Sequence, residues 1–179
     1  MGLPLSRNTN YAPSAPVLSA DLNALQDAVV GGLKGLSTLI VMGCAFQSRT
    51  PGTTPPQYNV NGLDGSILTI AGTANDFFYA PQLDARATIV NVRLKVRDFA
   101  ANTWQAHVYK VANVGLVSAT VTEPVAAISS LANATDQTLT FNAVNIPLAG
   151  GNGCYIRVQQ VAGTAAIRIY SAEIDYFVS

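Results

Sequence analysis

The sequence predicts an all-β fold, an antiparallel β-sandwich of the jelly-roll type, preceded by an extended N-terminal arm and one α-helix. Apolar and polar residues alternate along several runs, and turn-forming pairs such as Asn61-Gly62 and Gly150-Gly151 separate these runs. A count of roughly eight runs favours a jelly roll, and a seven-stranded immunoglobulin-like sandwich is the alternative.

The N-terminal part of the chain predicts an arm followed by a helix. Residues 1–18 contain three prolines, which favour extended backbone. Ser19 is a good N-cap, and an apolar stripe at helical spacing follows it, formed by Leu22, Leu25 and Val29. Gly31-Gly32 either ends the helix or bends it, and in the second case Leu33 and Leu36 continue the stripe. One short helix cannot bury this stripe alone, so it either packs on the β-domain or meets copies of itself. We expect residues 1–36 to dock or oligomerise the chain and residues 37–179 to form the sandwich.

Several runs have the period-2 pattern of a strand with one buried face. In residues 90–97, valine and leucine alternate with asparagine, arginine and lysine. Trp104 is in phase with small and apolar neighbours, which predicts a place in the core. Residues 165–178 change phase near Tyr170-Ser171, which predicts a β-bulge or a bend.

Residues 39–42 form the one run that is apolar on both faces, and this pattern favours cover by another chain or by the N-terminal helix. Charged residues make up 11% of the chain, against about 25% in an ordinary soluble domain. A surface with so little charge favours a homo-oligomer. We therefore predict an oligomer or docking interface that is formed by Ile40 and Met42 together with Leu22, Leu25, Val29, Leu33 and Leu36 of the helix.

The residues that could carry catalysis form no recognisable motif. His107 is the only histidine and is predicted on the outer face of a strand, which disfavours a zinc site or a catalytic triad. Glu173 and Asp175 share one strand face and could serve glycoside hydrolysis, or they could pair with Arg157 or Arg168. We predict that the protein is not an enzyme and has no catalytic residue, cofactor or metal.

Two other features have ordinary explanations. Cys44 and Cys154 are far apart in the sequence, and we expect two buried, reduced thiols, with a single bridge left open. Residues 61–66 contain one carboxylate, Asp64, which is fewer than a calcium loop provides, so a simple turn is expected there.

The charge balance limits the partners. The formal net charge is zero, which predicts no nucleic-acid binding. The most apolar window, residues 28–46, contains Lys34 and four glycines, so no membrane insertion is expected.

The aromatic residues provide candidates for binding. Phe77 and Phe78 are consecutive, so in a strand one of them faces away from the core. Phe78 and Tyr109 are the residues that we expect to contact a glycan or a protein partner.

Three stretches resemble phage virion proteins. Residues 5–11 read Leu-Ser-Arg-Asn-Thr-Asn-Tyr, and residues 16–27 contain Asp-Leu-Asn and Gln-Asp. Both are similar to the N-terminus of phage-type virion proteins, in which an extended arm leads into a helix. Residues 165–179, with alternating isoleucine and tyrosine, resemble the closing strand of phage jelly rolls. The resemblance implies a tail fibre, spike or capsid-decoration protein, often a homotrimer, with no catalytic motif.

These expectations combine into one functional prediction. The chain is a structural component of a phage or phage-like particle, a homotrimeric tail fibre or spike protein attached through its N-terminal arm. Its partners are copies of itself, other virion proteins and a host-surface glycan, and its location is the virion, assembled in the host cytoplasm. The alternatives are a capsid cement or decoration protein and a non-viral carbohydrate-binding jelly-roll module. The last predicts an exposed aromatic platform with flanking polar groups.

Overall fold

The chain divides into two compact units, Met1–Leu36 and Ser37–Ser179. The computed structural model describes the following residues: 35–48, 58–69, 76–100, 103–115, 119–130, 135–162 and 165–178. The predicted arm and nearly all of the predicted helix, with Leu22, Leu25, Val29 and Leu33, lie outside the described residues.

The described part of the second unit is an antiparallel β-sandwich, as predicted. Its larger sheet, sheet A, has the order β10-β6-β13-β4-β3, with β1 also paired to β13 and β11 to β6. The strands of sheet A are β1 (Ser37–Met42), β3 (Tyr58–Val60), β4 (Ile67–Thr69), β6 (Ala87–Asp98), β10 (Asp136–Phe141), β11 (Ile146–Pro147) and β13 (Ile167–Val178).

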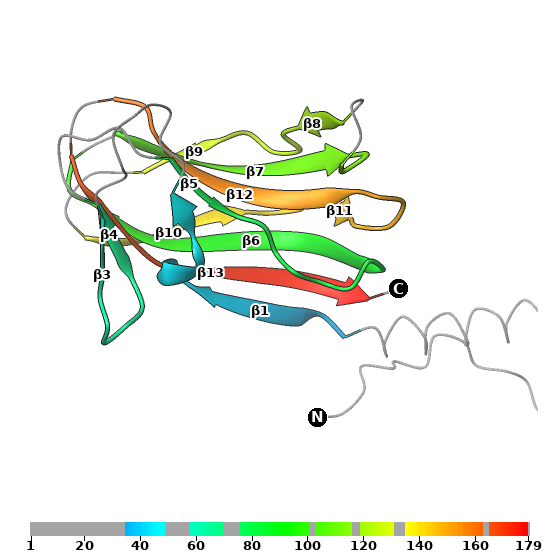
Figure 1. The fold of residues 1–179 in the computed structure, drawn as a ribbon, viewed down its shortest axis with the longest axis horizontal. Helices are drawn as coiled ribbons and strands as arrows, with labels where there is room; N and C mark the ends of the chain where they lie inside the picture. The colour runs from blue at the N-terminus through cyan, green and yellow to red at the C-terminus, as the bar shows by residue number, and fades with distance from the viewer. Residues whose placement is uncertain are drawn as a thin grey trace, which may run out of the picture. The chain divides into compact units, whose positions relative to one another are not determined.

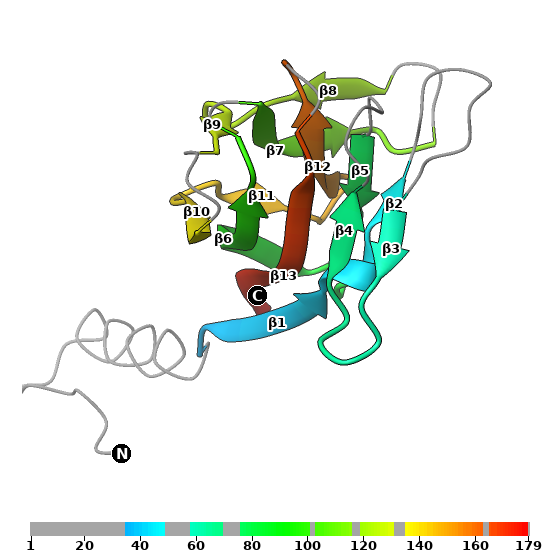
Figure 2. The ribbon, with the colours of Figure 1, turned by 90° about the vertical axis from the view of Figure 1, so that its left-hand side faces the viewer.

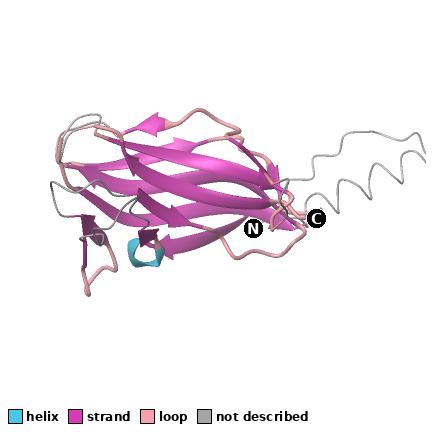
Figure 3. Cartoon of the chain, turned by 45° about the horizontal axis from the view of Figure 1, so that its top comes forward, coloured by secondary structure: helices cyan, strands magenta, loops and turns pink. Residues whose placement is uncertain are grey.

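The second sheet, sheet B, has the order β2-β5-β12-β7-β8, with β9 also paired to β7. Its strands are β2 (Gln47–Ser48), β5 (Asp76–Tyr79), β7 (Trp104–Ala112), β8 (Thr120–Thr122), β9 (Ile128–Ser129) and β12 (Gly153–Gln160). A 3₁₀ turn, η1 (Gly43–Ala45), carries the chain from β1 in sheet A to β2 in sheet B. Figures 1 and 3 show the two sheets as stacked layers, with β7 and β12 in one layer and β6, β13 and β1 in the other.

The core lies between the inner faces of the two sheets. Val92, Leu94 and Val96 of β6 are fully buried, which confirms the predicted alternation. Val90 departs from it, because β6 pairs Asn91 with β13 and then skips to Ile89, leaving Val90 as an unpaired bulge residue. The predicted bulge in β13 is confirmed, since the register with β6 shifts between Ile169 and Ser171.

A buried polar cluster fixes one end of the sandwich. Trp104 is in the core, as predicted, and its Nε1 donates a hydrogen bond to the carbonyl of Ala165 at 3.0 Å. The fully buried carboxylate of Asp98 accepts hydrogen bonds from the hydroxyls of Thr103 and Ser130. Because buried polar groups are costly unless they are hydrogen-bonded, these contacts tie the β6–β7 turn to the residue after β9.

Strand β1 has one covered face within the single chain. Val41 is buried and Leu39 is half-buried, but Ile40 and Met42 are 68% and 59% exposed. The physical reason is that only the inner face of sheet A meets sheet B. Leu36, just before β1, is also exposed. The interface predicted for these residues therefore stays a prediction.

Candidate functional site

A row of aromatic rings lies on the outer face of sheet B. In the strand register, Arg157 of β12 lies opposite Phe78 of β5 on one side and His107 of β7 on the other. Tyr155 of β12 lies opposite Tyr109 of β7. Alternate residues of a strand face the same side, and the residues in phase with Phe77, Ile156 and Val108 fill the core. The strands β5, β12 and β7 can be followed side by side in Figure 2. We call the outward residues Phe78, Tyr155, Tyr109 and His107 the aromatic face.

The rings of the aromatic face are in continuous contact. The ring centroids of Phe78 and Tyr155 are 6.0 Å apart, and those of Tyr155 and Tyr109 are 4.8 Å apart in a stacked arrangement. His107 stacks on Tyr109 with its centroid at 5.5 Å. Such pairs fix each ring in place. The side chains of Phe78, Tyr155 and Tyr109 remain half-buried, so the row is accessible from solvent.

The cation nearest to the centre of the row is already neutralised. The guanidinium of Arg157 lies over the ring of Phe78, 5.6 Å from its centroid, and its Nη2 contacts Oδ2 of Asp76 at 2.6 Å. A guanidinium is planar and stacks well on an aromatic ring. Arg157 therefore supports the position of Phe78 while Asp76 balances its charge.

His107 is more enclosed than we expected from the sequence. It lies on the outer face of its strand, as predicted, but it is only 8% exposed, because Glu123 and Tyr109 cover it. Its Nδ1 is 2.8 Å from Oε1 of Glu123 and 3.2 Å from the hydroxyl of Tyr109. The imidazole also stacks on the ring of Tyr109, with the two centroids 5.5 Å apart. The imidazole thus holds Tyr109 from the end of the row.

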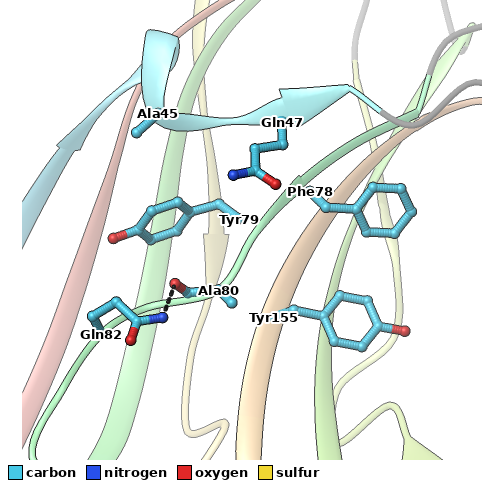
Figure 4. Close-up of a pocket in the computed structure, with 7 residues that line it drawn as sticks. All are labelled: Ala45, Gln47, Phe78, Tyr79, Ala80, Gln82 and Tyr155. Carbon is cyan, nitrogen blue, oxygen red and sulfur yellow. Dashed lines mark hydrogen bonds between the residues drawn. The ribbon is translucent and has the colours of Figure 1, made fainter.

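An open pocket of about 660 Å³ adjoins the Phe78 end of the row. Figure 4 shows the rings of Phe78 and Tyr155 side by side at the pocket, with the amide of Gln47 beside them and Tyr79 on the other side of β5. The remaining lining residues are Ala45, Ala80 and Gln82. Burial raises the pKa of the Tyr79 and Tyr155 hydroxyls, so both remain protonated donors at neutral pH. The pocket therefore offers rings, hydroxyls and amides.

The structure brings the two sequence candidates for binding into one site. Phe78 and Tyr109 lie on different strands, and Tyr155 between them contacts both rings. We did not predict Tyr155 as a site residue from the sequence. The alternation of apolar and polar residues indicates that Tyr155, between Cys154 and Ile156, faces outward. It does not indicate which residues of β5 and β7 lie beside Tyr155, because that depends on the register of the strands.

The second pair of candidate residues, Glu173 and Asp175, lies on the outer face of sheet A. Both carboxylates form ion pairs with Arg93, and Glu173 also pairs with Lys95 at 2.6 Å. The partners are on β6 and differ from the predicted Arg157 and Arg168, because β6 is the strand that adjoins β13 along this stretch.

These ion pairs set the protonation state of the two carboxylates. The hydrogen bond from Lys95, followed by that from Arg93, lowers the pKa of Glu173. The hydrogen bonds from Arg93 are the main cause of the lowered pKa of Asp175. Glycoside hydrolysis requires one carboxylic acid with a raised pKa. This pair therefore lacks the property that the hydrolase hypothesis needs.

The cysteines are both free thiols, Cys44 exposed and Cys154 buried, so the predicted burial of Cys44 is wrong. Burial raises the pKa of Cys154 to about 12, so this thiol is a poor nucleophile. No cluster of three or more metal-ligating side chains occurs among the residues that the structure describes. In the same part of the chain, no helix has the length and apolar character needed to cross a bilayer.

No protein-family model matches the chain, and no curated protein matches it.

Solved structures match it by fold. The xylan-binding module CBM15 superposes with a TM-score of 0.50 and 16% identity, covering 81% of this chain and 98% of the module. The CBM22-1 xylan-binding domain of Xyn10C from Paenibacillus barcinonensis gives a TM-score of 0.49 at 11% identity, covering 79% of this chain and 94% of that domain.

A family two carbohydrate esterase from Cellvibrio japonicus also matches, with a TM-score of 0.44 and 11% identity over 80% of this chain. The chain spans 36% of the length of that esterase. At these identities the likeness shows the fold alone, and the similarity to CBM15 identifies the sandwich as a jelly roll.

Proposed function

We propose that the protein is a non-catalytic carbohydrate-binding jelly roll whose aromatic face binds a neutral glycan. The observation that carries this proposal is the unbroken row of Phe78, Tyr155, Tyr109 and His107 on the outer face of sheet B.

The aromatic face has the properties of a stacking platform. The apolar C–H face of a pyranose packs against an aromatic ring, and a ring held by its neighbours loses little freedom when the sugar binds. The contacts from Tyr155 to both of its neighbours hold the three rings in one row. A row of rings favours an extended chain of several sugars over a single monosaccharide.

The charges around the aromatic face favour a neutral ligand. The guanidinium of Arg157, which lies over the ring of Phe78, is paired with Asp76, so it is not left to attract an acidic sugar. The amide side chain of Gln47 and the hydroxyls of Tyr79 and Tyr155 line the pocket as hydrogen-bonding groups. Such groups match sugar hydroxyls, which both donate and accept.

The comparison with solved structures supports the proposal in one respect. CBM15 is described as a xylan-binding module, so a jelly roll of this kind can bind a neutral polysaccharide. The argument for this chain depends on its own aromatic residues.

The test is isothermal titration calorimetry with unsubstituted xylan, cello-oligosaccharides, galactomannan and, as an acidic polymer, polygalacturonate. We expect binding to a neutral polymer, weakened at least about tenfold by Tyr155→Ala, because that change removes the ring that joins the row. The matched control is Tyr170→Ala, which removes a half-buried tyrosine from the outer face of sheet A. Absence of binding to every neutral polymer, or equal loss in both variants, contradicts the proposal.

A second candidate is a structural protein of a phage or phage-like particle. The observation that favours it is the exposed apolar pair Ile40 and Met42 on β1, which follows the N-terminal unit that contains the stretches resembling virion proteins. In this candidate residues 1–36 attach the chain to other virion proteins and the β-domain projects outward or covers a lattice. It expects three copies in solution, and the mass measured by light scattering tests it.

A further inference from the structure

The strand β1 lies at an open edge of sheet A. It hydrogen-bonds to β13 through residues 37–42, and no described strand pairs with its other side. An edge strand presents unpaired N–H and C=O groups, which form a template for another strand.

The side chains of β1 leave an apolar surface beside that edge. Ile40 lies opposite Glu173 and Met42 lies opposite Ser171, so both project from the outer face of sheet A. They are 68% and 59% exposed. The neighbouring carboxylates on this face, Glu173 and Asp175, already form ion pairs with Arg93. A partner therefore does not have to supply a charged group to neutralise them.

This edge lacks the features that normally protect a strand from pairing. Native edges are protected by lysine and other charges, by proline or by bulges. Residues 35–48, which contain all of β1, include no charged residue and no proline, and β1 pairs with β13 in continuous register. The opposite edge of sheet A differs, because β10 begins with the exposed Asp136 and presents threonines outward.

We propose that β1 pairs antiparallel with β1 of a second copy of this chain, joining two A sheets across a twofold axis. An uncharged apolar strand complements itself, whereas a charged partner segment would place its charge against Ile40. With the axis near Ile40, residue 38 of one copy faces residue 42 of the other and the two Ile40 side chains meet. The outward residues of both strands then lie on one face, as the pleat requires.

The experiment measures the mass of the full chain by sedimentation equilibrium. We expect a dimer, and we expect Ile40→Lys to weaken dimerisation at least about tenfold, because lysine charges the contact. Circular dichroism of the variant confirms that it is folded. The control is Val121→Lys, which places the same charge on β8, an exposed edge strand of sheet B, and should leave the dimer intact. A full chain that is monomeric or trimeric, or a dimer unaffected by Ile40→Lys, overturns the proposal.

A crosslink tests the geometry independently. In a Cys44→Ser background, which removes the exposed thiol near β1, Ile40→Cys places two thiols directly opposite each other across the proposed axis. We expect an intermolecular disulfide on mild oxidation, because opposed residues in an antiparallel pair are within disulfide distance. Failure to crosslink in a sample that sediments as a dimer places the contact elsewhere and overturns the strand pairing. Glycan binding through sheet B does not depend on this edge, so the two proposals fail separately.

Discussion

Gly43 shows, at the scale of one residue, how the chain passes from one sheet to the other. It is buried in η1, where the strand β1 ends and the chain crosses to β2. A Cβ atom built at this position would lie 2.0 Å from the carbonyl oxygen of Ile169. That oxygen belongs to the backbone of β13 and cannot move without disturbing the central strand. The crossing therefore needs a residue without a side chain.

We expect Gly43→Ala to destabilise the domain by about 2–3 kcal/mol, the usual cost of forcing extra atoms into a packed site. Urea unfolding followed by circular dichroism measures the change. Gly62→Ala is the control, since a Cβ there meets nothing within 4 Å. Equal stability of the two variants would show that β1 and β13 separate easily at this point.

In the aromatic face, the role of a single residue depends on which rings its own ring contacts. Tyr155 matters because its ring contacts both Phe78 and Tyr109. Its own sequence context, between Cys154 and Ile156, indicates only that it faces outward.

At the scale of elements, the pair β6 and β13 forms the centre of sheet A. Their inward residues fill the core, and their outward residues form the ion pairs of Arg93 and Lys95 with Glu173 and Asp175. Cross-strand pairs of opposite charge stabilise an antiparallel sheet. Asp175 also accepts a hydrogen bond from Thr38 of β1 at 2.8 Å, so the network includes the edge strand.

This network predicts a pH dependence of stability. The pKa values of Glu173 and Asp175 are lowered in the folded protein from reference values of 4.5 and 3.8. Their stabilising contribution is therefore complete above those reference values and is lost as the pH falls through the lowered values.

We expect Arg93→Gln to reduce the free energy of unfolding at pH 7 by about 1–3 kcal/mol, because it leaves the enclosed Asp175 without its ion-pair partner and leaves Glu173 with Lys95 alone. The variant should also lose less stability than the parent between neutral and acidic pH. Unfolding in urea at a series of pH values measures both effects. Arg86→Gln is the control, since Arg86 pairs with Asp84 on the exposed surface. Parallel pH curves for Arg93→Gln and the parent would contradict the assignment.

At the scale of the whole molecule, the two sheets give the domain two different outer faces. Sheet B presents the aromatic face, and sheet A presents a closed charge network beside the apolar edge at Ile40 and Met42. The two proposals therefore concern different faces: glycan binding is proposed for sheet B, and pairing with a second copy is proposed for the edge of sheet A. The low charge of the chain, 11%, agrees with a surface that is partly covered in use.

We expect a chain that begins at Gly35 to fold without the preceding residues, since Ser37–Ser179 forms a compact unit with its own core. Its unfolding temperature should lie within about 3 °C of that of the full chain, a shift that corresponds to roughly 1 kcal/mol or less. Thermal denaturation followed by circular dichroism tests this. A shortened chain that aggregates or unfolds without cooperativity would show that the first unit completes the domain.

The sequence by itself determined the fold class, the inward face of β6, the core position of Trp104 and the change of phase at Tyr170. These features depend on local alternation, which each strand carries in its own residues. Only the tertiary structure decided which strands are neighbours. Strand pairing joins residues far apart in the sequence through backbone hydrogen bonds that carry little side-chain information. It therefore took the structure to place Tyr155 between Phe78 and Tyr109, to pair Glu173 with Arg93, and to leave Ile40 at an open edge.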